Sequence, residues 1–502
     1  MLPRLARITT GLLFAFLAGI SALLILRWPY AQERIIARLE DATGSRVVVN
    51  RYRLDFFPEP GCTMEDLTFH RHAQQPIARA DTITIRSSWW SVLTLRKRVR
   101  RLHAERLHLQ IPSPFPSPVW SGRSGGLGDV IIGEFVADGA ILEFVSQNRD
   151  KPTRFALHQV RLNEVSGTRE IAYATELDIP DPPGRVKSSG TVGPFLRSAW
   201  GRTPVVGSFE LKGASLDKYK DLAGKIDGKG TFQGQLDNIC VRGSAVATAF
   251  EANRTGHPVD LRTAYTAHVN ALSGDVILQN VQADFLGTRL SIDGAVQGAK
   301  DKTVSLQVRE RHARVEDLLF MFTRSEPPAL IGPIQLRADI DLLPGDEPFI
   351  RRLVIRGRFS IRKARFARPR TQTKVNSLSA RARGDKKQVE DRLPEDVDHV
   401  LSELEGDVSL RKGVAVLSGI SFRVPGATAN GGGTYNLLTK RVDLTGTVSM
   451  VADVSEATSG IKSVLLKPFD GLFRRNRAKG ATLRASVRGQ YPRPQYRIGL
   501  RK

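Results

Sequence analysis

The sequence predicts a mainly β protein in which one transmembrane helix near the N-terminus precedes a long antiparallel β-sheet with short helices. Residues 8–26 contain no charged side chain, although charged residues make up 25% of the chain. Beyond this run, apolar and polar side chains alternate along many short segments, which is the period of a strand with one buried face. Glycines separate these segments where turns are expected, and helical periodicity is confined to short pieces.

The uncharged run at 8–26 is long enough to cross a bilayer. A helix over this run spans about 28 Å, close to the hydrocarbon thickness of a membrane. A cleaved signal peptide is the alternative, but it has a shorter apolar region and a small-residue cleavage site, which we do not find here. We therefore predict an uncleaved anchor, with Arg27, Trp28 and Tyr30 at the membrane interface. Basic residues flank the run on both sides, so their count does not decide its orientation.

Composition places the rest of the chain among folded proteins with a basic excess. The 502 residues are enough for several domains or for one extended repetitive structure. The formal net charge of +24 favours an anionic partner, either nucleic acid, an anionic lipid surface or acidic glycolipid. Cys62 and Cys240 are the only cysteines, which excludes a disulfide framework and a four-cysteine metal site. A single disulfide between them stays possible, and two unpaired thiols are the simpler interpretation.

Short helices and strands are expected in a defined order after the apolar run. An amphipathic helix at 31–41 carries Ile35, Ile36 and Leu39 on one side and ends at Gly44. Strand-like alternation then occurs at 82–86, 107–111, 209–211, 304–308, 334–342, 442–444 and 483–487. Helical segments are expected at 314–322, 394–404 and 454–466. We therefore predict a β-meander with short helices.

Composition also indicates where the chain divides. Prolines gather at 112–118 and glycines at 122–128, which marks the strongest internal boundary. The predicted parts are the N-terminus and anchor at 1–30, an N-terminal region at 31–111, a linker at 112–129, a middle β-repeat region at 130–325 and a C-terminal β-region at 326–502.

The clearest strand is 334–342, which places Ile334, Leu336, Ile340 and Leu342 on one face and polar side chains on the other. Strands of this kind must bury their apolar face against a second sheet, by closing a barrel, or against a ligand. An open trough would need a partner of matching character, and acyl chains are a natural one. The four side chains are therefore candidates for a lipid-binding groove, and packing in a closed core explains their alternation equally well.

No motif predicts catalysis, a cofactor or a metal site. Gly224–Thr231 resembles a phosphate loop, but its glycine spacing is wrong and no Ser or Thr directly follows the lysine. Gly431–Gly433 is expected to be a tight turn rather than an anion-binding loop. His70 and His72 have no evident third ligand, and the usual zinc-protease, nucleophile-elbow and dinucleotide patterns are missing. We therefore predict a protein that is not an enzyme and has no cofactor or metal.

Basic residues gather at 96–101, 351–370 and 474–477. Single-strand nucleic-acid binders interleave such charge with aromatic side chains, and aromatic residues are only 7% of this chain and few in the basic runs. No nucleic-acid partner is expected. A solvated surface is the simplest interpretation, followed by attraction to anionic headgroups. Residues 462–473 mix apolar and basic side chains, so both packing on the sheet and contact with a membrane remain open.

Several segments together resemble the AsmA family of bacterial envelope proteins. The resemblance covers both ends and much of the middle of the chain, and its C-terminal part is the most specific. The segments are Leu39–Val47, Phe57–Gly61, Ser91–Leu93, Gly133–Phe144, Phe155–Leu162, Leu417–Phe422, Val424–Ala427, Gly433–Leu437, Lys462–Phe469 and Gly480–Gly489.

The resemblance implies a single-pass anchor in the bacterial inner membrane and a body in the periplasm. It also implies an elongated, curled, taco-like or groove-like sheet that contributes to phospholipid transport or outer-membrane biogenesis, with phospholipids or other anionic envelope lipids as partners. The alternative is a non-enzymatic scaffold that pairs its strand edges with outer-membrane assembly proteins. An envelope hydrolase is the weakest hypothesis of the three.

Overall fold

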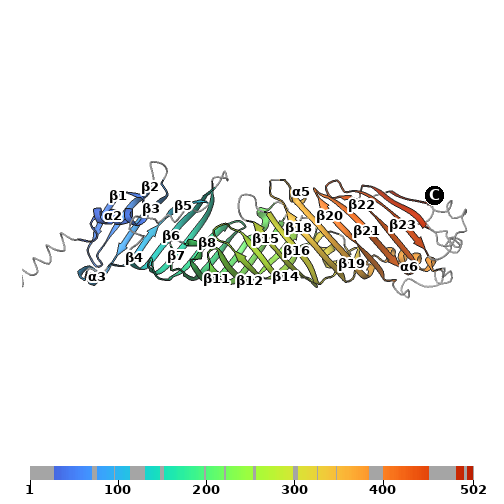
Figure 1. Cartoon of the computed structure of the whole chain (residues 1–502), viewed down its shortest axis with the longest axis horizontal. Coiled ribbons are helices and arrows are strands. Elements are labelled where there is room, and N and C mark those ends of the chain that lie inside the picture. The colour runs from blue at the N-terminus through green and yellow to red at the C-terminus, as the bar shows by residue number, and fades with distance from the viewer. Residues whose placement is uncertain are drawn as a thin grey trace, which may run out of the picture. The chain divides into compact units, whose positions relative to one another are not determined.

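The computed structural model consists mainly of strands, which confirms the mainly β part of the predicted fold class (Figure 1). The chain divides into two compact units, unit 1 with Met1–Phe209 and Gln233–Leu236, and unit 2 with Glu210–Phe232 and Asp237–Lys502. The structure describes residues 28–70, 76–94, 97–113, 130–146, 152–196, 199–219, 222–252, 256–297, 303–324, 326–345, 347–383, 400–450, 482–490 and 495–500.

No helix in these ranges has both the length and the apolar character needed to cross a membrane. The uncharged run at 8–26, for which we predict the anchor, lies outside the described residues, as does Arg27.

Unit 1 begins with a helix and continues as a sheet. Its elements are α2 (Gln32–Thr43), β1 (Arg46–Asp55), β2 (Gly61–His70), β3 (Ala78–Arg86), α3 (Trp89–Leu93), β4 (Arg98–Glu105), β5 (His108–Ser113), β6 (Ile131–Ser146), β7 (Thr153–Val165), β8 (Ile171–Pro180), β9 (Pro183–Val192) and the 3-10 turn Trp200–Arg202. Strands β10 (Pro204–Ser215) and β11 (Leu222–Gln235) carry residues of both units.

Helix α2 forms as its sequence predicts. Ile35 is buried in the core of unit 1, and Ile36 and Leu39 pack against that core. Gly44 ends the helix with a left-handed backbone (φ 62°), and its N–H donates to the carbonyl oxygen of Glu40 at 2.7 Å. Glycine adopts this conformation without a steric penalty, which explains why the helix stops there.

The sheet of unit 1 is antiparallel except at β6. Strands β4 and β5 both pair with β6 in parallel, one after the other along its length. A parallel pair needs a crossover connection rather than a hairpin, and the Pro/Gly-rich segment predicted as a linker joins β5 to β6, although 114–129 lies outside the described residues. The strands on both sides of this segment belong to one unit, and the division between units falls at Phe209.

Strand β2 supplies completely buried side chains to the core of unit 1. Cys62, Met64 and Leu67 of β2 are completely buried between α2 and the neighbouring strands. The Cys62 thiol is free, as is that of Cys240 in unit 2. Burial raises the pKa of the Cys62 thiol from 9.0 to about 11, because a thiolate would lose its hydration there.

This pKa shift predicts an alkaline loss of stability in unit 1. The folded-state pKa lies above the unfolded value, so the contribution is complete below about pH 9 and is lost as the pH rises towards 11. The loss should reach about 2–3 kcal/mol in the free energy of unfolding. Urea denaturation between pH 8 and about 10.5 measures it. Cys62→Ala should remove the part of the loss that appears between about pH 9 and 10, below the range in which the raised pKa values of the Tyr30 and Tyr52 hydroxyls contribute, and Cys240→Ala should not remove it. Equal curves for both variants would contradict the assignment.

Unit 2 is an antiparallel meander with short helices. Its remaining elements are the 3-10 turn Leu216–Lys218, β12 (Asn238–Ala252), β13 (Val259–Val269), β14 (Val276–Phe285), β15 (Thr288–Gln297), β16 (Thr303–His312), α4 (Val315–Phe322), β17 (Leu330–Ile331), β18 (Ile334–Leu342), α5 (Phe349–Arg352), β19 (Leu353–Phe366), α6 (Pro369–Ala382), β20 (Ser402–Arg411), β21 (Val414–Val424), β22 (Ala427–Asn436), β23 (Arg441–Met450), β24 (Thr482–Gln490) and β25 (Gln495–Leu500).

Two local predictions for unit 2 are wrong. Residues 402–404 belong to β20 rather than to a helix, because Leu404 pairs with Ile361 of β19 and strand pairing overrides the helical pattern. Gly431–Gly433 lies inside β22 rather than at a turn. A Cβ at Gly431 would lie 2.6 Å from the Thr445 carbonyl oxygen, so these glycines allow a close approach of neighbouring strands. The helix expected at 454–466 and the mixed stretch at 462–473 lie outside the described residues.

Candidate functional site: an apolar sheet face

Apolar side chains form continuous cross-strand rows on one face of the sheet of unit 2. In one row, Leu306 of β16 pairs with Ile340 of β18, which pairs with Ile355 of β19. In a second row, Ile334 pairs with Ile361. Because side chains alternate between the faces of a sheet, these rows share one face and the intervening polar residues occupy the other. Figure 1 shows β18 to β23 following one another along unit 2.

This apolar face carries no charged side chain on the described parts of β18 to β23. Its positions are occupied by leucine, isoleucine, valine, phenylalanine, alanine, glycine and methionine, with Ser402 and Tyr435 as the polar exceptions. At a strand spacing of about 4.8 Å the face is about 24 Å wide across these six strands. A surface of this size without charge resembles a core or a binding surface rather than an ordinary solvated one.

Helices α4 and α6 cover one end of the apolar face. Helix α4 packs against the end that contains Ile334, Ile361 and Ala364, which are buried. Helix α6 packs through Val375 against the corresponding end of β21 and β22, where Val424 is buried. Further along the strands, Leu306, Ile340 and Ile355 are only half-buried. The described apolar side chains of this face are thus buried at the helical end, while further along the strands some are half-buried and others, such as Leu410 of β20, are buried.

The four groove candidates from the sequence lie together as the alternation predicts. Ile334, Leu336, Ile340 and Leu342 share the apolar face of β18. Ile334 is 8% exposed beneath the helical end, whereas the other three are half-buried. Their common face is therefore established, and their contact with a ligand remains a prediction.

The opposite, polar face of the same strands has a basic hollow that the sequence did not reveal. Arg309, Arg337 and Arg358 are direct cross-strand neighbours on β16, β18 and β19. With Arg356 and Asp339 they line a hollow of about 860 Å³. Like charges placed directly opposite each other destabilise a sheet, so this arginine row is a local excess of positive charge.

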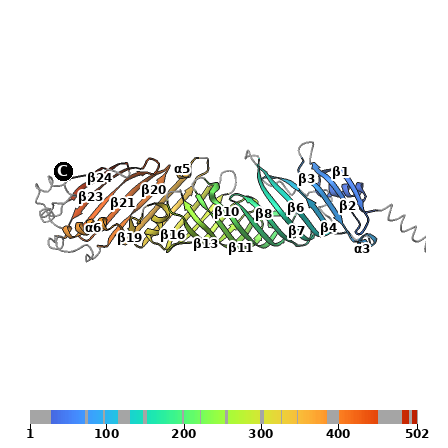
Figure 2. The same ribbon diagram turned by 180° about the vertical axis from the view of Figure 1, so that it is seen from behind.

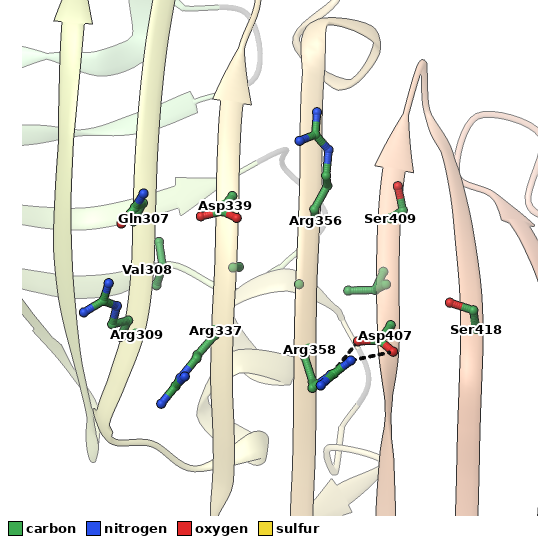
Figure 3. A pocket seen from close by; sticks show the side chains of 13 residues that line it. Gln307, Val308, Arg309, Arg337, Asp339, Arg356, Arg358, Asp407, Ser409 and Ser418 are labelled. Carbon is green, nitrogen blue, oxygen red and sulfur yellow. Dashed lines mark hydrogen bonds and ion pairs between the residues drawn. The ribbon is translucent and has the colours of Figure 1, made fainter.

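Only part of this charge is neutralised within the structure. Figure 3 shows Arg358 turned towards Asp407, and its Nε donates to the carboxylate at 2.7 Å. Arg309, Arg337 and Arg356 form no ion pair with any described residue. The basic run at 351–370 contains Arg356 and Arg358, whereas Arg309 and Arg337 join them only through the register of the strands.

The residues predicted for the membrane interface occupy different surroundings in unit 1. Trp28 and Tyr30 are buried in its core. The Tyr52 hydroxyl donates to the Tyr30 carbonyl oxygen at 2.5 Å, and the Trp28 ring lies 5.1 Å from that of Phe56. These two aromatic residues therefore attach the start of unit 1 to its own core.

The described residues bring no three His, Cys, Asp or Glu side chains together in a way that would hold a metal ion. Gly224–Thr231, which resembles a phosphate loop in sequence, lies within β11 and has no helix after it. Comparison of the chain with protein-family models, with curated proteins and with solved structures finds no match.

Proposed function

We propose that this protein is a lipid-handling protein of the AsmA type that holds acyl chains against the apolar face of unit 2. In this proposal the run at 8–26 anchors the chain in the bacterial inner membrane and the body lies in the periplasm. The protein contributes to phospholipid transport or outer-membrane biogenesis, and it carries out no covalent chemistry.

One observation supports this proposal most strongly: the described part of the apolar face is free of charge, yet several of its side chains are only half-buried. In a closed two-layer core, side chains such as Leu336 and Ile340 are buried on all sides. Here they retain access to solvent away from the helical end. Large exposed apolar surfaces are costly in water and usually mark a binding site. Acyl chains match this face because they are apolar and need no hydrogen-bond partners.

Photocrosslinking in living cells tests the proposal. A benzophenone amino acid replaces Leu336 or Ile340 on the apolar face, or Gln335 or Asp339 on the polar face of the same strand. Cells are labelled with radioactive phosphate, and the purified full-length chain is analysed for a covalently attached phospholipid. We expect adducts at Leu336 and Ile340 and none at the two polar positions. Lipid adducts missing from all four positions, in chains that fold normally, would refute lipid binding at this face.

The arginine row favours a second candidate function, a scaffold that binds an acidic partner protein. Arg309, Arg337 and Arg356 offer unpaired guanidinium groups on an exposed face, and such groups bind carboxylates through paired hydrogen bonds. The same crosslinking experiment separates the two functions, because protein adducts at Gln335 and Asp339 without lipid adducts at Leu336 would favour the scaffold.

A further inference from the structure

Unit 1 exposes a compact group of large apolar side chains at one end. Phe56 and Phe57 follow β1, while Trp89, Trp90 and Leu93 belong to α3, which lies at one end of unit 1 in Figures 1 and 2. Phe57 is 88% exposed and Trp90 67%. We call these five residues the aromatic tip. Side chains of this size are rarely exposed as a group unless they contact a partner.

The two parts of the aromatic tip are fixed to each other. The indole N–H of Trp89 donates to the carbonyl oxygen of Pro58 at 3.2 Å, which ties α3 to the loop after β1. The Ser87 N–H donates to the carbonyl oxygen of Pro60 at 2.9 Å. The Trp28 ring lies against both parts. Its centre is 5.1 Å from the centre of the Phe56 ring and 6.0 Å from that of the Trp89 ring. The exposed rings therefore stand on a packed base.

The carboxylates next to the aromatic tip are paired with arginines. Asp55 forms an ion pair with Arg86 at 2.5 Å, and Glu59 pairs with Arg100. Burial alone would raise the pKa of Asp55, but hydrogen bonds from Thr63 and Arg86 outweigh it and lower that pKa. Paired carboxylates are less strongly repelled by an anionic lipid surface than isolated ones.

The position of the aromatic tip in the chain identifies its partner. The uncharged run ends at Leu26, and Trp28, two residues later, contacts both Phe56 and Trp89. If residues 8–26 cross a bilayer, the membrane interface lies within a few residues of Trp28. Tryptophan concentrates at this depth because its ring is apolar and its N–H is polar. A bilayer therefore supplies the apolar environment that the exposed rings lack.

We propose that the aromatic tip inserts into the interface of the same membrane that holds residues 8–26, with Phe57 and Trp90 entering most deeply. This inference rests on the proposed anchor and extends it from a single helix to the folded body. The tip takes the interfacial role that the sequence assigned to Trp28 and Tyr30, which instead support it from within the core. Two attachment points, rather than one flexible tether, then fix the orientation of unit 1 on the membrane.

Depth-dependent fluorescence quenching of the full-length chain tests this inference. In a Cys62→Ala, Cys240→Ala background, a single cysteine replaces Phe57 or Trp90 and carries a small fluorophore. Leu286 of unit 2, which is 60% exposed, is replaced in the same way as a matched control. The chains are reconstituted into phospholipid vesicles with or without lipids brominated near the headgroup. We expect quenching at 57 and 90 to exceed that at 286 by at least about threefold.

The outcomes distinguish failure of the tip from failure of the anchor. If the chain resists carbonate extraction but the labels at 57 and 90 are quenched no more than that at 286, the tip does not insert and the anchor stands. Shielding of these labels from aqueous iodide without bromine quenching would indicate that the tip is covered by protein, such as a second copy of the chain, and would also overturn the inference. If carbonate extracts the chain, both the anchor and the inserted tip are refuted. If the labelled chains fail to fold, the intrinsic tryptophan fluorescence of the chain with both native cysteines is measured instead. Trp90→Phe must then reduce the quenching of this fluorescence by the brominated lipid.

Discussion

Replacement of Leu336 by aspartate is expected to weaken phospholipid binding to unit 2 by about 50- to 300-fold. A carboxylate in contact with acyl chains is in surroundings like those of a bilayer centre, where an aspartate costs about 2.5–3.5 kcal/mol. Every 1.4 kcal/mol changes an affinity tenfold. Leu336 pairs with Phe359, and the described parts of β18 to β23 place no cation on this face that could neutralise the new charge. Titration of the purified chain with a fluorescent phospholipid measures the effect.

Gln335→Asp is the matched control for this substitution. It adds the same charge one residue away on the same strand, but on the exposed polar face. We expect its affinity for lipid to stay within about twofold of the unmodified chain, because a surface charge in water costs little. Equal weakening by both variants would show that net charge, rather than contact with the apolar face, governs binding. Unchanged affinity in Leu336→Asp would remove β18 from the lipid site.

The sequence predicted best those features that depend on local pattern. Strand β18 spans the predicted residues 334–342, and α2 ends at Gly44, because alternation and a left-handed glycine act within a few residues. The helix predicted at 394–404 fails at 402–404, where pairing with β19 determines the structure. The glycines inside β22 resemble a turn in sequence, but they allow a close approach of backbones to a neighbouring strand that the local pattern does not reveal.

The features that the sequence missed depend on register and on tertiary contacts. The arginine row requires Arg309, Arg337 and Arg358 to be neighbours on three strands, and their separations in the chain give no sign of this. The aromatic tip has a local signal, the pairs Phe56-Phe57 and Trp89-Trp90, but only the fold shows that both pairs stand at one end of unit 1. Register and fold, rather than composition, therefore locate the candidate contact surfaces.

Leu67→Ala is expected to lower the free energy of unfolding of unit 1 by about 2–5 kcal/mol. Leu67 is completely buried in the core, so its removal loses apolar burial and leaves a cavity that rigid neighbours cannot fill. The same substitution at Leu336 of unit 2 should cost less, about 1–2 kcal/mol, because that side chain is only partly buried and its loss creates no closed cavity. Chemical denaturation followed by hydrogen exchange of β2 and β18 separates the two units.

This comparison decides between an open apolar face and a closed core without any lipid assay. If Leu336→Ala destabilises unit 2 as strongly as Leu67→Ala destabilises unit 1, the apolar face of β18 is packed in solution and cannot hold acyl chains as it stands. If Leu336→Ala costs little, the side chains along this face are not tightly packed in solution. A surface that exchanges lipid requires such loose packing. Ile361→Ala provides the internal reference, because Ile361 shares the apolar face but is buried beside α4. It should behave like Leu67, with a loss of several kcal/mol, so a small effect there would show that the helical end is also open.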